Sequence, residues 1–271
     1  MQTASLGNLL YCVLAAGDMA RREQPKGRYF DRAYKSDGTV VTAMDKQLDH
    51  YLRDEITKLF PKANVLTEES KHSFDNTRAL TLVVDPIDGT EGYSQGMHYW
   101  CISVGILDKD LIPVGGIVYS PRLDLLFVAE IGKPATLNGV PIAPNDSVDL
   151  LSAKSSIMVS SMLHQQIDLT RFPARILNIG SAALRLCFPL IYPGIFGTIE
   201  SRQIHIWDMV GAHAINRSLG FRLEYQTNGS INYADLVNGS PVHDIVLAGS
   251  PQHVQILRHT LERLSSIKTK G

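Results

Sequence analysis

Residues 80–90 constrain this chain more than any other segment, because a short, largely apolar run leads straight into an acidic one. Leu80–Val84 has the composition of a buried strand, and the string Asp-Pro-Ile-Asp-Gly-Thr follows it from Asp85 to Thr90. Two carboxylates three residues apart, with a proline between them, cannot both point the same way along a regular strand. We therefore expect the chain to turn here, so that Asp85, Asp88 and a backbone carbonyl converge on one point.

An all-oxygen cluster of this kind suits a hard cation such as Mg²⁺. Gly89 permits close approach of the backbone, and the amides of Gly89 and Thr90 could receive a phosphate oxygen. The alternative is a solvated turn, since Asp, Pro and Gly are ordinary turn residues. An aspartyl-phosphate motif fits poorly, because its two acids stand two residues apart and these stand three apart. The full string behind an apolar strand favours the metal site.

Two further acidic positions belong to the same hypothesis. Glu68 follows the apolar pair Val65-Leu66, and Asp208 follows Trp207 where a helix is predicted to begin. Each has a simpler interpretation, which is a charged surface pair for Glu68-Glu69 and a helix N-cap for Asp208. Glu68 gains weight because it stands shortly before the strand that leads to Asp85, whereas for Asp208 the residues alone leave the N-cap interpretation open.

The composition excludes several classes of protein. With 44% hydrophobic and 20% charged residues, the 271-residue chain can bury a sizeable core. Its 26 basic and 27 acidic side chains leave no positive excess for general binding to nucleic acid. Three widely spaced cysteines and a first segment without a signal-peptide pattern predict a cytoplasmic protein, and no apolar stretch is long enough to span a membrane.

Hydrophobic periodicity predicts a mixture of helices and strands, and hence an α/β (α+β layered) fold. The expected helices cover residues 9–21, 42–60, 181–188, 208–219 and 252–264, with a capping-box-like pair at Thr42 and Asp45. The expected strands cover residues 80–84, 100–107, 114–119, 123–130, 156–160 and 195–199. The polar stretch 145–149 predicts a division into an N-terminal half, 1–148, and a C-terminal half, 149–271.

Taken together, these segments resemble the inositol monophosphatase superfamily of lithium-sensitive, magnesium-dependent phosphomonoesterases. The string from Asp85 to Thr90 and the pair Trp207-Asp208 match its two signature motifs. Three more segments match in the family's order: 41–45, 68–70 and 180–183. The resemblance spans roughly residues 10–250. It implies alternating helix and sheet layers, with the active site between two halves.

The resemblance also implies a role for each motif residue, with two or three Mg²⁺ per site. Glu68, Asp85 and the carbonyl of Ile87 would hold the first metal. Asp85 would bridge to a second metal held by Asp88 and Asp208. Thr90 and Asp45 would orient the attacking water and help to deprotonate it, although the Thr90 hydroxyl could instead merely cap a helix. Substrate contacts are predicted for Lys35, Gly89, Thr90, Gly180, Ser181, Arg202 and His205.

The resemblance implies a small phosphorylated metabolite as substrate, and the identity of that metabolite is the more open question. Asp37 stands two residues after Lys35, and Asp45 stands ten after it, as in the branch that hydrolyses adenosine 3′,5′-bisphosphate. Histidinol-phosphatase-like members have a similar segment, and inositol monophosphatases usually carry one more residue there. Inositol monophosphatases also place an acid seven residues before the Trp-Asp aspartate, where this chain has Ser201 and its neighbour Glu200.

Other interpretations remain open. The segment 91–93, Glu-Gly-Tyr, is typical of neither branch, so an inositol monophosphatase or a histidinol-phosphatase is the alternative to a nucleotidase. A metal- and phosphate-binding regulator without catalysis is the non-enzyme alternative, and a homodimer is also open. His98, His205 and His213 lack zinc-ligand spacing and favour structural roles, although His205 is near enough to Asp208 to touch substrate.

Overall fold

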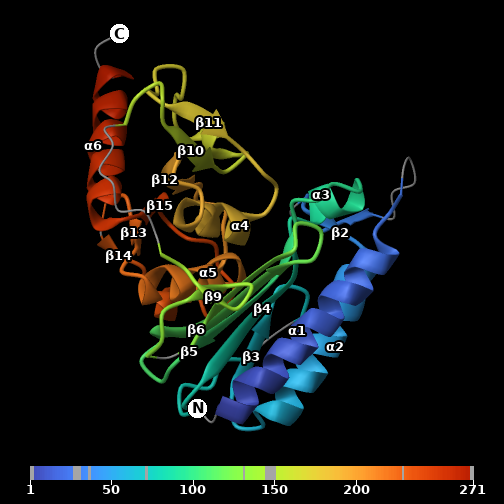
Figure 1. Ribbon diagram of the computed structural model, residues 1–271. Coiled ribbons are helices and arrows are strands. Elements are labelled where there is room, and N and C mark those ends of the chain that lie inside the picture. Colours follow the sequence, from blue (N-terminus) through green and yellow to red (C-terminus); the bar gives the residue numbers. More distant parts are fainter. Residues whose placement is uncertain are drawn as a thin grey trace.

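A computed structural model (Figure 1) describes the chain except for a few short segments. The described residues are 3–26, 32–35, 38–70, 73–130, 132–143, 151–227 and 229–268. The predicted boundary between halves at 145–149 lies outside them and stays a prediction. Within the described residues, no helix has the length and apolar character that crossing a membrane requires.

Two sheets carry most of the strands. The first has seven strands in the order β3-β4-β5-β6-β7-β8-β9, namely Asn64–Thr67, Thr81–Asp88, Cys101–Leu107, Pro113–Ser120, Leu125–Ala129, Thr136–Leu137 and Val140–Pro141. The second has six strands in the order β11-β10-β12-β15-β13-β14, namely Arg175–Leu177, Ser156–Val159, Ile195–Glu200, Val246–Gly249, Arg222–Tyr225 and Gly229–Ser230. A short hairpin pairs β1 (Ala33–Tyr34) with β2 (Val40–Val41).

Helices alternate with these sheets to give five layers (Figure 1). Helices α1 (Thr3–Glu23) and α2 (Ala43–Leu59) cover the outer face of the first sheet. Between the two sheets lie α4 (Ala182–Cys187) and α5 (Ile206–Ser218), while α6 (Pro251–Lys268) covers the far face of the second sheet. The short α3 (Thr90–Ser94) and three 3-10 turns, η1 (Leu163–Gln165), η2 (Phe188–Leu190) and η3 (Tyr233–Asp235), complete the fold.

Three apolar cores fill the interfaces between the layers. One lies beneath α1 and α2 and includes Leu48 and Leu52, both fully buried. The largest fills the space between the sheets and includes Met209 and Val210 of α5. A third lies beneath α6 and includes Leu257. The predicted layered α/β fold is therefore confirmed.

Most of the predicted elements are present with shifted ends. Helix α2 begins with the predicted capping box, in which Thr42 accepts from the amide of Asp45 and the Asp45 carboxylate accepts from the amide of Thr42. Asn138 and Gly139, with φ of 51° and 79°, form the turn between β8 and β9. Strands β13 and β15 were not predicted.

The prediction that the chain turns at Asp85–Asp88 was wrong, because the strand does not end there. Strand β4 continues through Asp88, and the pairing with β5 is irregular between Asp85 and Asp88. A bulge of this kind aims side chains differently without ending the strand, and Pro86 can stand there because no ladder hydrogen bond is required of it. The two acids thus reach a common side from within the sheet.

Helix α5 packs on the first sheet at very short range. A methyl group added at Gly116 of β6 would lie 2.2 Å from the carbonyl oxygen of Gly211, and one at Gly105 of β5 would lie 2.3 Å from the side chain of Val210. The helix therefore packs closely on both strands, and at Gly116 the strand meets the backbone of Gly211 directly.

Candidate active site

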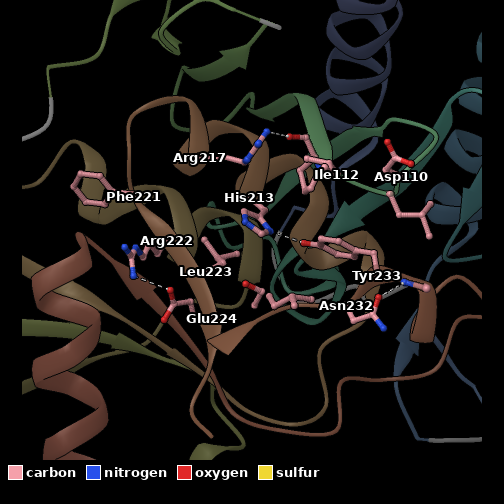
Figure 2. Close-up of a pocket in the computed structure, with 15 residues that line it drawn as sticks. Asp110, Ile112, His213, Arg217, Phe221, Arg222, Leu223, Glu224, Asn232 and Tyr233 are labelled. Carbon is pink, nitrogen blue, oxygen red and sulfur yellow. Dashed lines mark hydrogen bonds and ion pairs between the residues drawn. The ribbon is translucent and has the colours of Figure 1, made fainter. Parts of the chain in front are cut away.

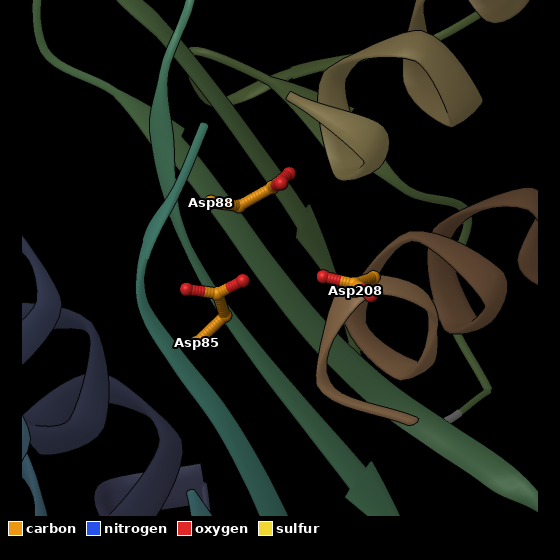
Figure 3. Close-up of side chains that lie close together, drawn as sticks. All are labelled: Asp85, Asp88 and Asp208. Carbon is orange, nitrogen blue, oxygen red and sulfur yellow. The ribbon is translucent and has the colours of Figure 1, made fainter. Parts of the chain in front are cut away.

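Three aspartates from distant parts of the chain meet at the carboxyl end of β4 (Figure 3). Asp85 and Asp88 come from the irregular end of β4, and Asp208 comes from the first turn of α5. One carboxylate oxygen from each lies within 4.8 Å of the others. The elements that position them belong to both predicted halves of the chain, so neither half contains the whole cluster.

The electrostatics of the cluster call for a cation. Burial raises the pKa of Asp85 well above its ordinary value, and repulsion from Glu68, Asp88 and Asp208 raises it further. Burial and repulsion from Asp88 and Glu68 do the same to the pKa of Asp208. Closely spaced buried carboxylates resist ionisation unless positive charge balances them. The donor set of oxygens alone fits a hard divalent ion.

Asp88 differs from its neighbours because hydrogen bonds hold its carboxylate. The hydroxyl of Ser181 donates to Oδ2 at 2.5 Å, and the amides of Ala182 and Ala183 donate to Oδ1 and Oδ2 at 3.0 and 2.6 Å. These donors form the first turn of α4. Burial raises the pKa of Asp88, while Ser181 and the nearby Arg185 oppose that rise.

The predicted catalytic pair is assembled beside the cluster. The hydroxyl of Thr90 lies 2.9 Å from Asp45 Oδ1 and 2.9 Å from the carbonyl oxygen of Ile87. The other carboxylate oxygen of Asp45 is held by Thr42, whose amide donates at 2.8 Å. Burial raises the pKa of Asp45. The N-cap of α3 is Gly89, without a side-chain cap, so the alternative of Thr90 as the capping residue was wrong.

Glu68 and Lys35 form an ion pair in the structure. Lys35 Nζ lies 2.7 Å from Glu68 Oε1 and 2.5 Å from Glu69 Oε1. Burial would lower the pKa of Lys35, but the two carboxylates raise it above its ordinary value. Burial raises the pKa of Glu68 to about 7 against the opposing effect of Lys35. Glu68 thus interacts with Asp85 and Asp208 electrostatically, although it is not one of the three acids within 4.8 Å.

The remaining predicted site residues in this part of the fold lie at or just before the N-termini of α3, α4 and α5. Gly89 has a φ of 98°, and a methyl group there would lie 3.0 Å from the carbonyl oxygen of Tyr99. Gly180 packs against Gly89 and directly precedes Ser181. Ser181 is fully buried and its hydroxyl is committed to Asp88, so a substrate contact at this residue falls to its backbone.

Arg202 and His205 lie on the loop from β12 to α5, ahead of Asp208. Arg202 has a 56% exposed side chain, and its guanidinium lies 3.9 Å from Asp244. The amide of His205 donates to Asp208 Oδ2 at 2.5 Å, and its ring stacks on Trp207 with centroids 5.0 Å apart. The loop therefore places the partly exposed imidazole of His205 beside Asp208, and it also carries the exposed cation Arg202, which pairs with Asp244.

Sequence reasoning missed a buried ion pair behind Asp88. Arg185 of α4 donates to both carboxylate oxygens of Glu200 at 2.6 and 2.7 Å, and the two side chains are 5% and 0% exposed. Arg185 also donates to the carbonyls of Ile179 and Gly180 at 2.5 and 3.3 Å. An arginine between Leu184 and Leu186 in an apolar helix was the available signal, because a charge there needs a buried partner.

Comparison with known proteins identifies the family. A family profile described as "Inositol monophosphatase family" matches residues 10–250. The chain belongs to this family. Inositol monophosphatase 3 of Solanum lycopersicum is 29% identical over 240 residues, which cover 81% of this chain and 86% of that protein. The 3′(2′),5′-bisphosphate nucleotidase CysQ of Buchnera aphidicola is 23% identical over 237 residues, covering 82% and 86%.

The fold agrees with that of a solved structure. The extragenic suppressor protein suhB from Bartonella henselae superimposes with a TM-score of 0.80 at 22% identity, over 96% of this chain and 98% of that one. As a member of the inositol monophosphatase family, the chain is a phosphatase that hydrolyses small phosphomonoesters. The family is metal-dependent, and the three-aspartate cluster is a group that could hold the metal.

Proposed function

We propose that this inositol monophosphatase family member is a magnesium-dependent bisphosphate nucleotidase, which removes the 3′-phosphate of adenosine 3′,5′-bisphosphate to leave AMP. The observation that carries the catalytic part is the cluster of Asp85, Asp88 and Asp208 beside the Thr90–Asp45 hydrogen bond. One group offers acids for the metals, and the other offers a base for the attacking water.

The residues present fit magnesium better than a softer metal. The cluster offers carboxylate oxygens, and Mg²⁺ prefers oxygen ligands, whereas zinc sites use nitrogen or sulfur. Glu68 and the carbonyl of Ile87 would complete the set for two or three ions. When bound, the ions would neutralise the phosphate dianion and make a water molecule more acidic.

The hydroxyl of Thr90 would be the group of this chain that activates the attacking water. Thr90 has a single proton to donate, and Asp45 Oδ1 and the Ile87 carbonyl both lie at hydrogen-bond distance from it. When that proton points to Asp45, the Thr90 oxygen is free to accept a proton from water. Thr90 would then pass its own proton to Asp45 as the water attacks phosphorus. Asp45 is suited to receive it because burial raises its pKa.

The substrate assignment rests on what surrounds the loop before α5. Inositol monophosphatases place an acid where this chain has Ser201, which is 1% exposed and hydrogen-bonded to Ser160 at 3.1 Å. The neighbouring Glu200 is fully buried in its pair with Arg185 and is turned away from solvent. The exposed charge on this loop is instead the cation Arg202. A cation favours a substrate with a second phosphate over a neutral polyol ring.

The experiment measures release of inorganic phosphate from four substrates, with and without magnesium. We expect adenosine 3′,5′-bisphosphate to give a higher kcat/KM than inositol 1-phosphate, histidinol phosphate or fructose 1,6-bisphosphate. Preference for inositol 1-phosphate would select the alternative function. Full activity in chelator would exclude the metal mechanism, and no activity on any substrate would support a binding protein without catalysis.

Arg202→Gln gives a sharper test of the substrate class. If Arg202 binds the 5′-phosphate, the change should raise KM for adenosine 3′,5′-bisphosphate about tenfold, as expected for a lost charge-assisted hydrogen bond, and leave KM for inositol 1-phosphate unchanged. Arg175→Gln is the matched control, because Arg175 is an exposed arginine on β11, at the edge of the sheet that also contains β12. Equal effects on both substrates would contradict the nucleotidase assignment.

A further inference from the structure

A cavity of about 650 Å³ is shown in Figure 2, and none of the three clustered aspartates lines it. It forms where the turn between β5 and β6, the last turns of α5, strand β13 and η3 meet. Asp208 stands in the first turn of α5, and Arg217, which lines the cavity, stands nine residues later. At 1.5 Å per residue, the two lie about 14 Å apart along the helix. The cavity is therefore separate from the catalytic site and has the size of a small-molecule pocket.

The walls of the cavity combine apolar surface with a few polar groups. Phe221 and Leu223 are almost fully buried, and Ile112 at the opposite side is 39% exposed. His213 and Tyr233 are joined at the base by a hydrogen bond of 2.8 Å between Nδ1 and the phenol oxygen. Burial and the charge of Arg217 lower the pKa of His213 to about 4, so the imidazole is neutral at physiological pH.

The charges that line the cavity are unequally compensated. Asp110 accepts from Lys109 at 2.7 and 2.8 Å, and Glu224 accepts from Arg258 at 2.7 Å, although neither cation lines the cavity. Arg222 shares the same glutamate. The hydrogen bond of Arg217 goes instead to the uncharged carbonyl of Pro113, at 3.1 Å. Arg217 is exposed, and among the described residues no carboxylate lies within ion-pair distance of it, so its guanidinium is accessible to an anionic ligand.

We propose that this cavity is a binding site for a small organic acid, whose carboxylate meets Arg217 and whose apolar body lies between Ile112 and Phe221. An apolar body without charge would leave Arg217 unmatched. A bare anion such as inorganic phosphate would leave the apolar walls against water. The combination selects a ligand that carries both features.

The test uses two probes of equal shape, 2-naphthoate and the uncharged 2-naphthamide. Each is titrated into the full-length protein with saturating magnesium, and backbone amide shifts are followed by NMR both at residues 230–234 of the cavity and around the aspartate cluster. We expect 2-naphthoate to bind at least tenfold more tightly than the amide, with shifts confined to the cavity and unaffected by inorganic phosphate. Shifts centred on the aspartate cluster, displaced by inorganic phosphate, would overturn the proposal.

Two variants separate charge from shape. Arg217→Gln should weaken 2-naphthoate about tenfold and leave 2-naphthamide unchanged, because only the carboxylate uses the guanidinium. Ile112→Trp should fill the mouth and weaken both probes. Arg21→Gln is the control, since Arg21 is exposed on α1, away from the cavity. Equal affinity of Arg217→Gln and wild type for 2-naphthoate would contradict the proposed site, as would unchanged binding of both probes to Ile112→Trp.

Discussion

Ser181 donates its hydroxyl to Asp88 at 2.5 Å and thereby ties the start of α4 to the end of β4. The same hydroxyl accepts from the amide of Leu184 at 3.1 Å, so one side chain both caps a helix and orients an acid of the cluster. Asp88 is consequently the acid with the most stabilised charge. Within the described part of the chain, Asp85 accepts from one amide, that of Ile87 at 3.0 Å, and carboxylates that repel it lie around it.

This difference predicts opposite effects of two similar substitutions in chelator. Asp85→Asn should raise Tm by several degrees, because it removes repulsion and its side-chain oxygen can keep the bond from Ile87. Asp88→Asn should lower Tm by a similar amount, because its NH₂ group would face one of the donors at the start of α4. Thermal unfolding of both variants decides the matter. A shift in the same direction for both would show that repulsion does not dominate at Asp85.

Thr90 offers a test of water activation. Thr90→Ser keeps the hydroxyl between Asp45 and Ile87 and should retain substantial kcat, whereas Thr90→Ala should lose about a hundredfold or more. KM should change little in either variant, because the amide at this position remains. Steady-state kinetics with magnesium at saturation gives the answer. Equal kcat in the two variants would leave the water without its proposed base.

Two adjacent glycines on β6 predict different outcomes for the same change. Gly116→Ala would place a methyl group 2.2 Å from the backbone of Gly211, so it should cost roughly 1–3 kcal/mol and displace α5 with Asp208. Metal affinity, measured by calorimetry, should fall at least tenfold. Gly115→Ala is the matched control, because the nearest atom to its methyl group would be the end of the Ile106 side chain, at 3.2 Å, and the nearest backbone atom, the carbonyl oxygen of Ala129, would lie 3.6 Å away. If both variants bind metal as wild type does, the position of α5 does not depend on this contact.

His213 predicts a loss of stability in acid. Its pKa is about 4 when folded, below the ordinary 6.5, so the unfolded chain binds the extra proton first. Its contribution is complete above pH 6.5 and is lost as pH falls toward 4. Urea unfolding between pH 4 and 7 should therefore show a smaller acid-induced loss for His213→Gln than for wild type. His164→Gln, at an exposed histidine, should follow wild type, and parallel curves for all three would contradict the assignment.

The acids of the site could be predicted from the sequence because the pattern that identifies them lies in their immediate sequence neighbours. Asp85 and Asp88 can be recognised as candidate metal ligands from their spacing and from the apolar strand before them. The Thr42–Asp45 capping box indicates where α2 begins. What escaped prediction depends on distant partners. The Arg185–Glu200 pair forms between an interior helix and a strand, so neither residue's burial is evident from its neighbours in sequence.

The misread features of the fold have physical reasons as well. Pro86 between two acids is typical of a turn, and only pairing with β5 keeps β4 extended as a bulged strand. Strand β15, Val246–Gly249, has four buried residues, too few for periodicity to distinguish a strand from a helix segment. Strand β13 does alternate in burial, with Leu223 and Tyr225 inward, and that signal could have identified it.

The backbone contact between α5 and the first sheet also bears on how this protein can change over evolutionary time. The position of Asp208 relative to Asp85 depends on Gly105, Gly116 and Gly211, where α5 and the strands approach too closely to admit a methyl group. Apolar side chains around that contact can therefore be exchanged by drift without altering the spacing of the three acids. The glycines cannot, so a lineage could replace much of its interior and its substrate loop while retaining the same metal-binding geometry.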